Sequence, residues 1–310
     1  MATEPTTDNH PNKTTTTSPP TIIGSPTKNF WLYHPSTGFD LTHPPTPTSP
    51  PINPRLTLAT TTQPITLDPA KTALLIIDMQ NFFLSPAFGR NPQGPGHKAM
   101  GQLIQHAIPA ARKAGVRVVW VNWGLTEEEV ESMPTSMLRT FGAVGAEGSG
   151  KDGTVYVGLG GETGMRDDGK GGEVDAGGLL MRGAWNSGLY GELEGVYEEG
   201  RNLEMKPDVW IHKNRMSALW GGRTELEGFL EEQGITSLLF TGVNTDQCVG
   251  GTLQDAFSKG YDCVLLSDGA GTSSPGFAQE CMEYNAQKSW GFVASCEGFA
   301  KGVDEMASKQ

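Results

Sequence analysis

The chain has 310 residues, and its 23 lysines and arginines face 35 aspartates and glutamates, which gives a net charge of −12. A surface this negative repels phosphate backbones and anionic lipids, so the composition argues against nucleic acids and membranes as partners. No apolar run reaches the roughly 18 residues that span a bilayer. The first residues also lack the apolar core of a secretory signal, and we therefore expect a cytoplasmic protein.

Residues 1–64 are predicted to be a Pro/Thr-rich, largely disordered N-terminal arm. They hold 13 of the 21 prolines together with long runs of threonine. Such a segment has few backbone donors and little apolar surface, so it cannot nucleate a core. Within it, residues 29–33 carry three aromatic side chains. We expect this stretch to pack on the folded domain or on a neighbouring subunit.

Residues 65–310 are predicted to form one α/β domain. Five short apolar runs without polar alternation are typical of buried parallel strands: Ala73–Ile77, Val116–Val121, Val209–Ile211, Ser237–Thr241 and Cys263–Leu266. Helical patterns lie between them: Lys98–Lys113, a helix that a capping box opens at Thr224–Glu227, and Cys248–Lys259. The alternation predicts a doubly wound, mainly parallel sheet flanked by helices.

One insertion interrupts this alternation. The stretch 142–178 holds 14 glycines in 37 residues. It includes Gly158-Leu-Gly160, but no complete dinucleotide-binding fingerprint follows. We expect a surface loop, and a lid over the site and a plain linker remain equal alternatives.

Three residues of complementary chemistry fall at predicted strand ends, where open α/β sheets bind ligands. They are Asp78, Lys213 and Cys248. Alone, each has an ordinary explanation, as a helix cap, a solvated lysine and an inert thiol. Together they predict a nucleophilic site in which a helix N-terminus and Lys213 lower the thiol pKa and Asp78 accepts the thiol proton. Backbone N–H groups around Asn244 and Cys248 then face the oxyanion.

The segments TALLIIDMQNFF, IHKNRMSAL and LLFTGVNTDQCVGGTLQDAFSKGYDCVLLSDG resemble the three signature blocks of the isochorismatase-like cysteine hydrolases, over roughly residues 70–298. The resemblance implies a six-stranded parallel sheet and an Asp78–Lys213–Cys248 triad. It also implies a non-proline cis peptide at Val243–Asn244 that aims the oxyanion-hole amides.

The resemblance also narrows the chemistry. Nicotinamidases of this family bind a metal through an Asp-x-His pair after the second strand, where this chain reads VNWGLTEEEV without histidine. We therefore expect no metal and no cofactor. Isochorismatases proper lack the cysteine, so Cys248 favours hydrolysis of a C–N bond. The segment MRGAWNSGLYGEL resembles the ureidoacrylate amidohydrolases most.

Six residues are predicted to contact a small-molecule substrate: Phe83, Asn122, Trp123, Trp185, Arg215 and Met216. Asn122 matches a substrate-contacting asparagine of that group, with an aromatic neighbour at 123. Met216 stands where those enzymes carry tyrosine, so a soft apolar side chain replaces a hydrogen-bond donor. Arg215 either grips a carboxylate or is structural. For Trp185 a packing role is favoured.

The preferred interpretation is thus a metal-independent cysteine hydrolase that cleaves a small amide, ureide or carbamoyl substrate through an acyl-enzyme. Two alternatives stay open. One is hydrolysis of the vinyl ether of isochorismate to pyruvate, and the other is a non-catalytic binding protein on the same fold. The resemblance further implies a homo-oligomer, either a dimer or a tetramer.

Overall fold

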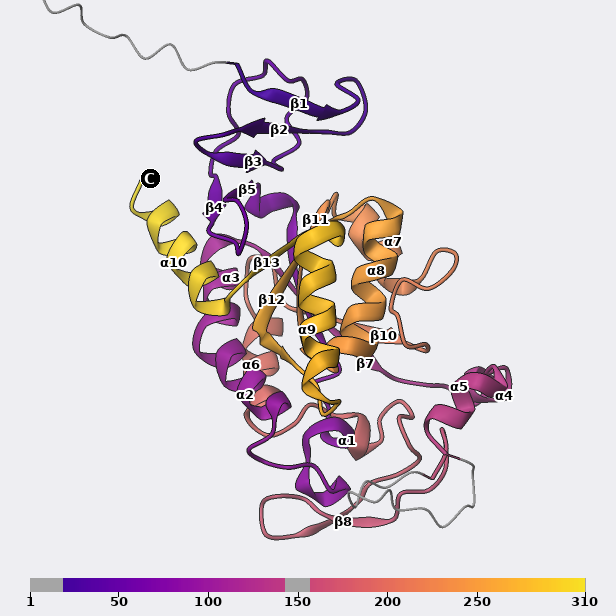
Figure 1. Ribbon diagram of the computed structural model, residues 1–310. Helices are drawn as coiled ribbons and strands as arrows, with labels where there is room; N and C mark the ends of the chain where they lie inside the picture. Colours follow the sequence, from indigo (N-terminus) through magenta and orange to yellow (C-terminus); the bar gives the residue numbers. More distant parts are fainter. Residues whose placement is uncertain (1–18, 143–156, 310) are drawn as a thin grey trace, which may run out of the picture.

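The computed structural model describes residues 19–142 and 157–309, and Figure 1 shows a central sheet with helices on both of its faces. The sheet has six strands, all parallel, in the order β10-β7-β6-β11-β12-β13. Their bounds are Thr72–Ile77 for β6, Arg117–Trp123 for β7, Val209–Lys213 for β10, Ser237–Val243 for β11, Asp262–Gly271 for β12 and Phe292–Ala294 for β13. The predicted α/β fold, doubly wound around a mainly parallel six-stranded sheet, is confirmed.

The two faces of the sheet carry separate apolar cores. Over one face lie α7 (Glu225–Glu232), α8 (Gly250–Lys259) and α9 (Gly276–Asn285). Over the other lie α2 (Pro95–Gln102), α3 (Ile108–Ala114), α6 (Glu192–Arg201) and α10 (Cys296–Ala307). Short helices α1 (Asn81–Leu84), α4 (Glu127–Glu131) and α5 (Thr135–Thr140) belong to the connections. Every residue of β6 and β11 is buried because both strands are covered on both faces.

The predicted helix ends are largely where the sequence signals put them. Gly115 closes the α2–α3 helix with φ of +70°, and the Thr224 side chain accepts the N–H of Glu227 at the start of α7. The α2–α3 helix differs in its interior, where Leu103–Ala107 form a π-helical turn. Pro109 has no N–H to donate to residue 105, and a widened turn accommodates that missing bond.

The prediction of a largely disordered N-terminal arm is wrong for residues 19–64, while residues 1–18 lie outside the described part. A second sheet forms over residues 21–67 in the order β1-β2-β3-β5-β4, so it also crosses the predicted boundary between residues 64 and 65. Its strands are Thr21–Gly24, Phe30–His34, Gly38–Asp40, Leu56–Leu58 and Ile65–Leu67 for β1 to β5. The prediction averaged composition over the whole arm, but many of the prolines lie between strands, and buried Leu56 and Leu58 alternate with exposed Thr57.

The aromatic stretch of this arm packs on its own domain. The buried carboxylate of Asp262 accepts hydrogen bonds from Trp31 Nε1 at 2.8 Å and from Ser237 Oγ at 2.9 Å, and it pairs with His43 Nε2 at 2.7 Å. The Trp31 ring also lies 5.9 Å from that of Phe292. Asp262 is the first residue of β12, so the small sheet is attached at the amino-terminal edge of the large sheet.

The glycine-rich insertion is described from residue 157 onwards. Strands β8 (Met165–Asp167) and β9 (Glu173–Asp175) form an antiparallel hairpin, and Leu159 and Ala176 are buried in the core. The stretch 143–156 lies outside the described residues, so the alternative between lid and linker stays open. Across the described ranges, no helix is both long and apolar enough to cross a bilayer.

Candidate active site

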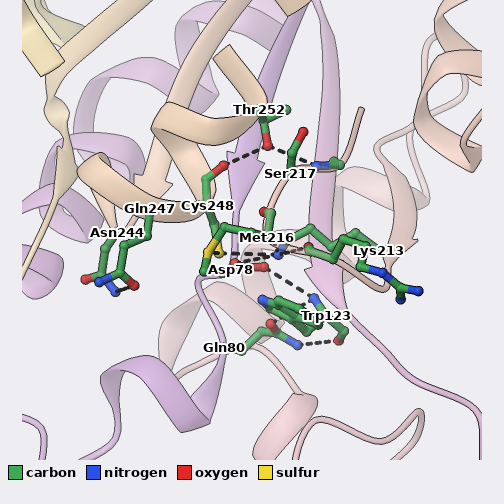
Figure 2. A network of polar contacts seen from close by, with 12 residues as sticks. Asp78, Gln80, Trp123, Lys213, Met216, Ser217, Asn244, Gln247, Cys248 and Thr252 are labelled. Atoms are coloured by element: carbon green, nitrogen blue, oxygen red, sulfur yellow. Dashed lines mark hydrogen bonds and ion pairs between the residues drawn. The ribbon is translucent and has the colours of Figure 1, made fainter. Parts of the chain in front are cut away.

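The carboxyl ends of the parallel strands bring the three predicted catalytic residues together. Asp78 directly follows β6, Lys213 ends β10, and Cys248 lies in the turn after β11. Lys213 Nζ is 3.1 Å from Asp78 Oδ2 and 3.4 Å from Cys248 Sγ (Figure 2). All three residues are buried, with relative exposures of 0%, 4% and 3% for Asp78, Lys213 and Cys248. The sequence prediction of their proximity therefore agrees with the geometry.

The backbone after β6 aims the Asp78 carboxylate at this point. Asp78 has a left-handed φ of +55°, and its N–H donates to the carbonyl of Val121. Its Oδ1 accepts the N–H of Trp123 at 3.3 Å. Gln80, which the sequence prediction missed, links the same strand end by donating from Nε2 to the carbonyls of Trp123 and Ser187, both at 2.7 Å. The sequence feature that could have identified Gln80 is its position as a polar residue just after an apolar core strand.

Lys213 is held by four acceptors around one ammonium group. Besides the carboxylate and the sulfur, Nζ donates to the carbonyls of Arg215 at 3.1 Å and Met216 at 3.3 Å. The ammonium also lies 3.9 Å from the centroid of the Trp123 ring. A buried charge needs such compensation, because a desolvated ammonium without partners is very costly. Lys213 Nζ is therefore held in place between Asp78 and Cys248 by these contacts.

The turn that carries Cys248 begins earlier than the sequence indicated. Helical structure starts with a π-helical turn over Thr245–Val249, and α8 follows it. The Thr252 hydroxyl donates to the carbonyl of Cys248 at 2.7 Å and accepts the N–H of Ala218 at 3.1 Å. This hydroxyl links the Cys248 turn to the segment after Lys213, so two hydrogen bonds set the position of one relative to the other.

The peptide bond between Val243 and Asn244 is cis. The Asn244 carbonyl accepts the N–H groups of Gln247 and Val249 and so starts the helical turn. Its side-chain Oδ1 accepts the N–H of Ser273 at 3.4 Å, and Figure 2 shows the side chains of Asn244 and Gln247 lying side by side. An oxyanion hole formed by the backbone amides of Asn244 and Cys248 stays a prediction.

Burial reverses one expectation about the thiol. The sequence analysis expected Lys213 and the helix N-terminus to lower its pKa, but burial, followed by the charge of Asp78, raises the pKa of Cys248 to about 12 against the opposing effect of Lys213. Burial also raises the pKa of Asp78, although Lys213 acts to lower it. Both groups are less acidic than in water because their charged forms are desolvated. The resting cysteine is therefore a thiol.

Among the predicted substrate contacts, Met216 contacts the Cys248 thiol directly. Its Sδ is 3.4 Å from Cys248 Sγ (Figure 2). Trp123 underlies the ammonium, as described above. Arg215 instead stacks on Trp220, with its guanidinium carbon 4.6 Å from the ring centroid, and donates to the Asn214 carbonyl.

The remaining aromatic candidates line the region around α1. Phe83 is half-buried beside Phe82, with ring centroids 4.9 Å apart, and Phe82 is fully buried in the core. Trp185 stacks on Phe88 at 6.1 Å. It also lines a cavity of ≈ 380 Å³ together with His212. Trp185 thus combines the packing role that was favoured with a place on a cavity wall.

Several buried polar atoms of these strand ends lack a hydrogen-bond partner in the described part of the chain. They include both amide atoms of Asn122, Nε1 of Trp123 and Oγ1 of Thr245. All three residues are completely buried. Unsatisfied buried polar groups cost free energy, so their presence at the edge where ligands bind indicates groups available to a ligand.

Comparison with known proteins identifies the family of the chain. The isochorismatase domain model matches residues 72–295. Two curated proteins called ureidoacrylate amidohydrolase RutB, from Rhizobium rhizogenes and Agrobacterium fabrum, are each 29% identical over 255 residues. These matches cover 81% of this chain, and 91% and 98% of the two relatives.

Solved structures show the same fold. A cysteine hydrolase from Pseudomonas syringae pv. phaseolicola superposes with a TM-score of 0.55 at 18% identity, covering 82% of this chain and 100% of that one. The nicotinamidase PncA from Bacillus subtilis gives a TM-score of 0.52 at 22% identity, covering 73% and 99%. Because the domain model covers residues 72–295, which include the whole large sheet, the chain belongs to the isochorismatase family and is a hydrolase of that family.

Proposed function

We propose that the protein cleaves the C–N bond of a small amide, ureide or carbamoyl substrate through a covalent acyl-enzyme on Cys248. The observation that carries this proposal is the contact of one buried ammonium, Lys213 Nζ, with both Asp78 Oδ2 and Cys248 Sγ. A nucleophile, a base and a fixed cation then meet at one point. The C–N bond is supported by the amidohydrolase activity named for the two curated relatives.

The first step is a proton transfer inside the buried site. The Cys248 thiol gives its proton to the Asp78 carboxylate, while Lys213 stays cationic. The net charge of the three groups is zero before and after the transfer. Because no charge is created in the low-dielectric interior, this route avoids the desolvation that opposes ionisation of the thiol to solvent. The raised pKa of Asp78 also makes its carboxylate a stronger base toward the thiol.

The thiolate then attacks the substrate carbonyl carbon. A C–S bond forms, and the carbonyl π electrons move to the oxygen, which the backbone N–H groups of Asn244 and Cys248 stabilise. Protonated Asp78 gives its proton to the leaving nitrogen as the C–N bond breaks, which releases an amine or ammonia. Water next attacks the thioester and gives a proton to Asp78, and the acid product leaves as the Cys248 thiol is restored.

Substrate polar groups are expected to meet the unsatisfied atoms beside the triad. Asn122 offers one amide donor group and one carbonyl acceptor, a pattern that matches an amide or ureide. Met216 presents a thioether next to the nucleophile, where the acyl group forms. We therefore propose that the amide end of the substrate contacts Asn122 and its acyl side chain contacts Met216.

A panel of ureides, carbamoyl amino acids and simple amides tests the proposal. Ammonia release should occur with at least one of them, and intact-mass spectrometry should show an acyl adduct on Cys248. Cys248→Ala should abolish both signals, whereas Cys296→Ser, at another buried thiol, should retain them. No ammonia and no adduct from any compound would overturn the proposal. Pyruvate release from isochorismate that survives Cys248→Ala would favour vinyl-ether hydrolysis instead.

A further inference from the structure

Helix α9 differs from its neighbours in how little of it is buried. Among the described α-helices of eight or more residues, it alone has no buried residue. Figure 1 shows it at the front of the molecule with the sheet behind it. Its side chains Phe277 and Tyr284 are 72% and 57% exposed. Large aromatic side chains this exposed on a surface helix indicate contact with a partner.

These exposed residues lie on one face of the helix. Phe277, Cys281 and Tyr284 are spaced i, i+4 and i+7, which places them along one stripe. Cys281 is a free, exposed cysteine between the two rings. We call these three residues the α9 stripe. It has an aromatic ring four residues before the cysteine and another three residues after it.

We propose that the α9 stripe is the contact surface for a second copy of this chain, with the two α9 helices packed antiparallel about a two-fold axis at Cys281. A two-fold interface must be complementary to itself after a half turn. Reversing the stripe end to end places Phe277 of one copy against Tyr284 of the other and leaves cysteine facing cysteine. This near-symmetry favours a second copy over an unrelated partner.

The packing distances of helices make the arrangement testable. Packed helices have axes about 8–10 Å apart, and Cα atoms lie about 2.3 Å from each axis. Two Cα atoms that face each other at the crossing point are therefore roughly 3.5–5.5 Å apart. This range overlaps the 4.4–6.8 Å Cα separation typical of disulfides. Cys281 of one copy should thus be able to bond directly to Cys281 of the other.

The two aromatic rings would form the centre of such an interface, but they bury less area than a stable interface requires. With aromatic side chains burying about 150–250 Å² each, the exposed parts of Phe277 and Tyr284 supply roughly a third of the ~800 Å² that a standard interface buries per partner. The remaining area would have to come from the surfaces that flank α9. Central aromatic anchors with flanking contacts are the usual composition of a stable interface.

Two measurements on the full chain test the interface. Light scattering should give the wild-type protein a mass of twice the 33.2 kDa chain, or a higher even multiple. The double variant Phe277→Ser, Tyr284→Ser should halve that mass. Met205→Ser, which removes a side chain that is 83% exposed elsewhere, should leave it unchanged. Mild oxidation should produce a reducible dimer band that Cys281→Ser abolishes, because the other three cysteines are buried.

Each result decides the proposal without reference to catalysis. A monomeric wild-type protein would overturn it, including the case in which a different protein covers α9. A mass that the double variant leaves unchanged would also overturn it, since another surface would then hold the copies together. A cross-link that persists in Cys281→Ser would place the axis elsewhere. Mass and cross-linking both remain readable even if no amide is hydrolysed.

Discussion

Replacing Lys213 with methionine tests the electrostatics on which the proposed mechanism depends. The Lys213 and Asp78 side chains are 2% and 0% exposed and 3.1 Å apart. Removing one partner of a buried ion pair costs about 3–5 kcal/mol, because the other charge is left uncompensated. Asp78 avoids that cost by taking up a proton. Since Lys213 is the main influence that lowers the Asp78 pKa, that pKa should rise further, and protonated Asp78 cannot accept the thiol proton.

The expected loss in kcat/KM is about 10²–10⁴-fold, the usual contribution of a general base. The acid limb of the pH–rate profile should move to higher pH, because a carboxyl with a higher pKa becomes a base only at higher pH. Steady-state kinetics with the best amide from the panel measures both effects. Arg112→Met is a matched control, since it breaks the 2.7 Å pair between partly exposed Arg112 and buried Asp208 and should lower stability without lowering kcat/KM. Wild-type kcat/KM with an unmoved acid limb in Lys213→Met would refute the reasoning.

Three further predictions concern Cys248, Gly242 and Trp31. In a Cys281→Ser background, the rate at which a neutral alkylator labels Cys248 should change little from pH ~7 to ~10, because the reactive thiolate forms by proton transfer to Asp78 and a pKa of about 12 keeps ionisation to solvent small. Mass spectrometry follows this rate, and a rise of about tenfold per pH unit would contradict the prediction. Gly242→Ala should lower the free energy of unfolding, measured in urea, by at least about 2 kcal/mol. Gly242 has a φ of +109°, and a Cβ at this position would collide with the Ile77 backbone. The control Gly276→Ala places its Cβ in open space and should cost little stability. Trp31→Phe should cost about 1.5–3 kcal/mol by removing a hydrogen bond to the charged Asp262, with kcat/KM unchanged; lost activity at unchanged stability would argue against the assigned role.

The large sheet was predictable because its strands are buried on both faces. Strands such as β6 and β11 consist of continuous apolar residues, and that signal needs no partner to be recognised. The edge strand β13, with only three residues, lacks that length, and its position was not located from the sequence. The candidate catalytic residues Asp78, Lys213 and Cys248 lie at strand ends, and their proximity was predicted by combining the strand prediction with the rule that parallel strands end at one edge.

The small N-terminal sheet was missed for the opposite reason. Its strands have three to five residues, and in β4 and β5 the apolar side chains alternate with a threonine that composition counts as polar. The contacts that order these strands come from a distant part of the sequence. Asp262 hydrogen-bonds Trp31 and His43, which are more than 200 residues away along the chain. The three partners of this buried carboxylate come together only in the folded chain, so no local sequence pattern predicts them. Prediction from composition therefore underestimates segments that are ordered by long-range contacts.

The thiol pKa shows the same limit at the catalytic site, and it changes the expected mechanism. From the sequence, a lysine and a helix N-terminus near Cys248 should favour a thiolate, since each stabilises negative charge. The sequence does not show that Asp78, Lys213 and Cys248 are all buried, and in that environment the desolvation of a second anion beside Asp78 outweighs the effect of one ammonium. Only one negative charge is stable beside Lys213 at a time. In the proposed mechanism the thiolate therefore forms when Asp78 gives up its own charge by taking the proton, and this couples activation of the Cys248 thiol to the acid that later protonates the leaving nitrogen.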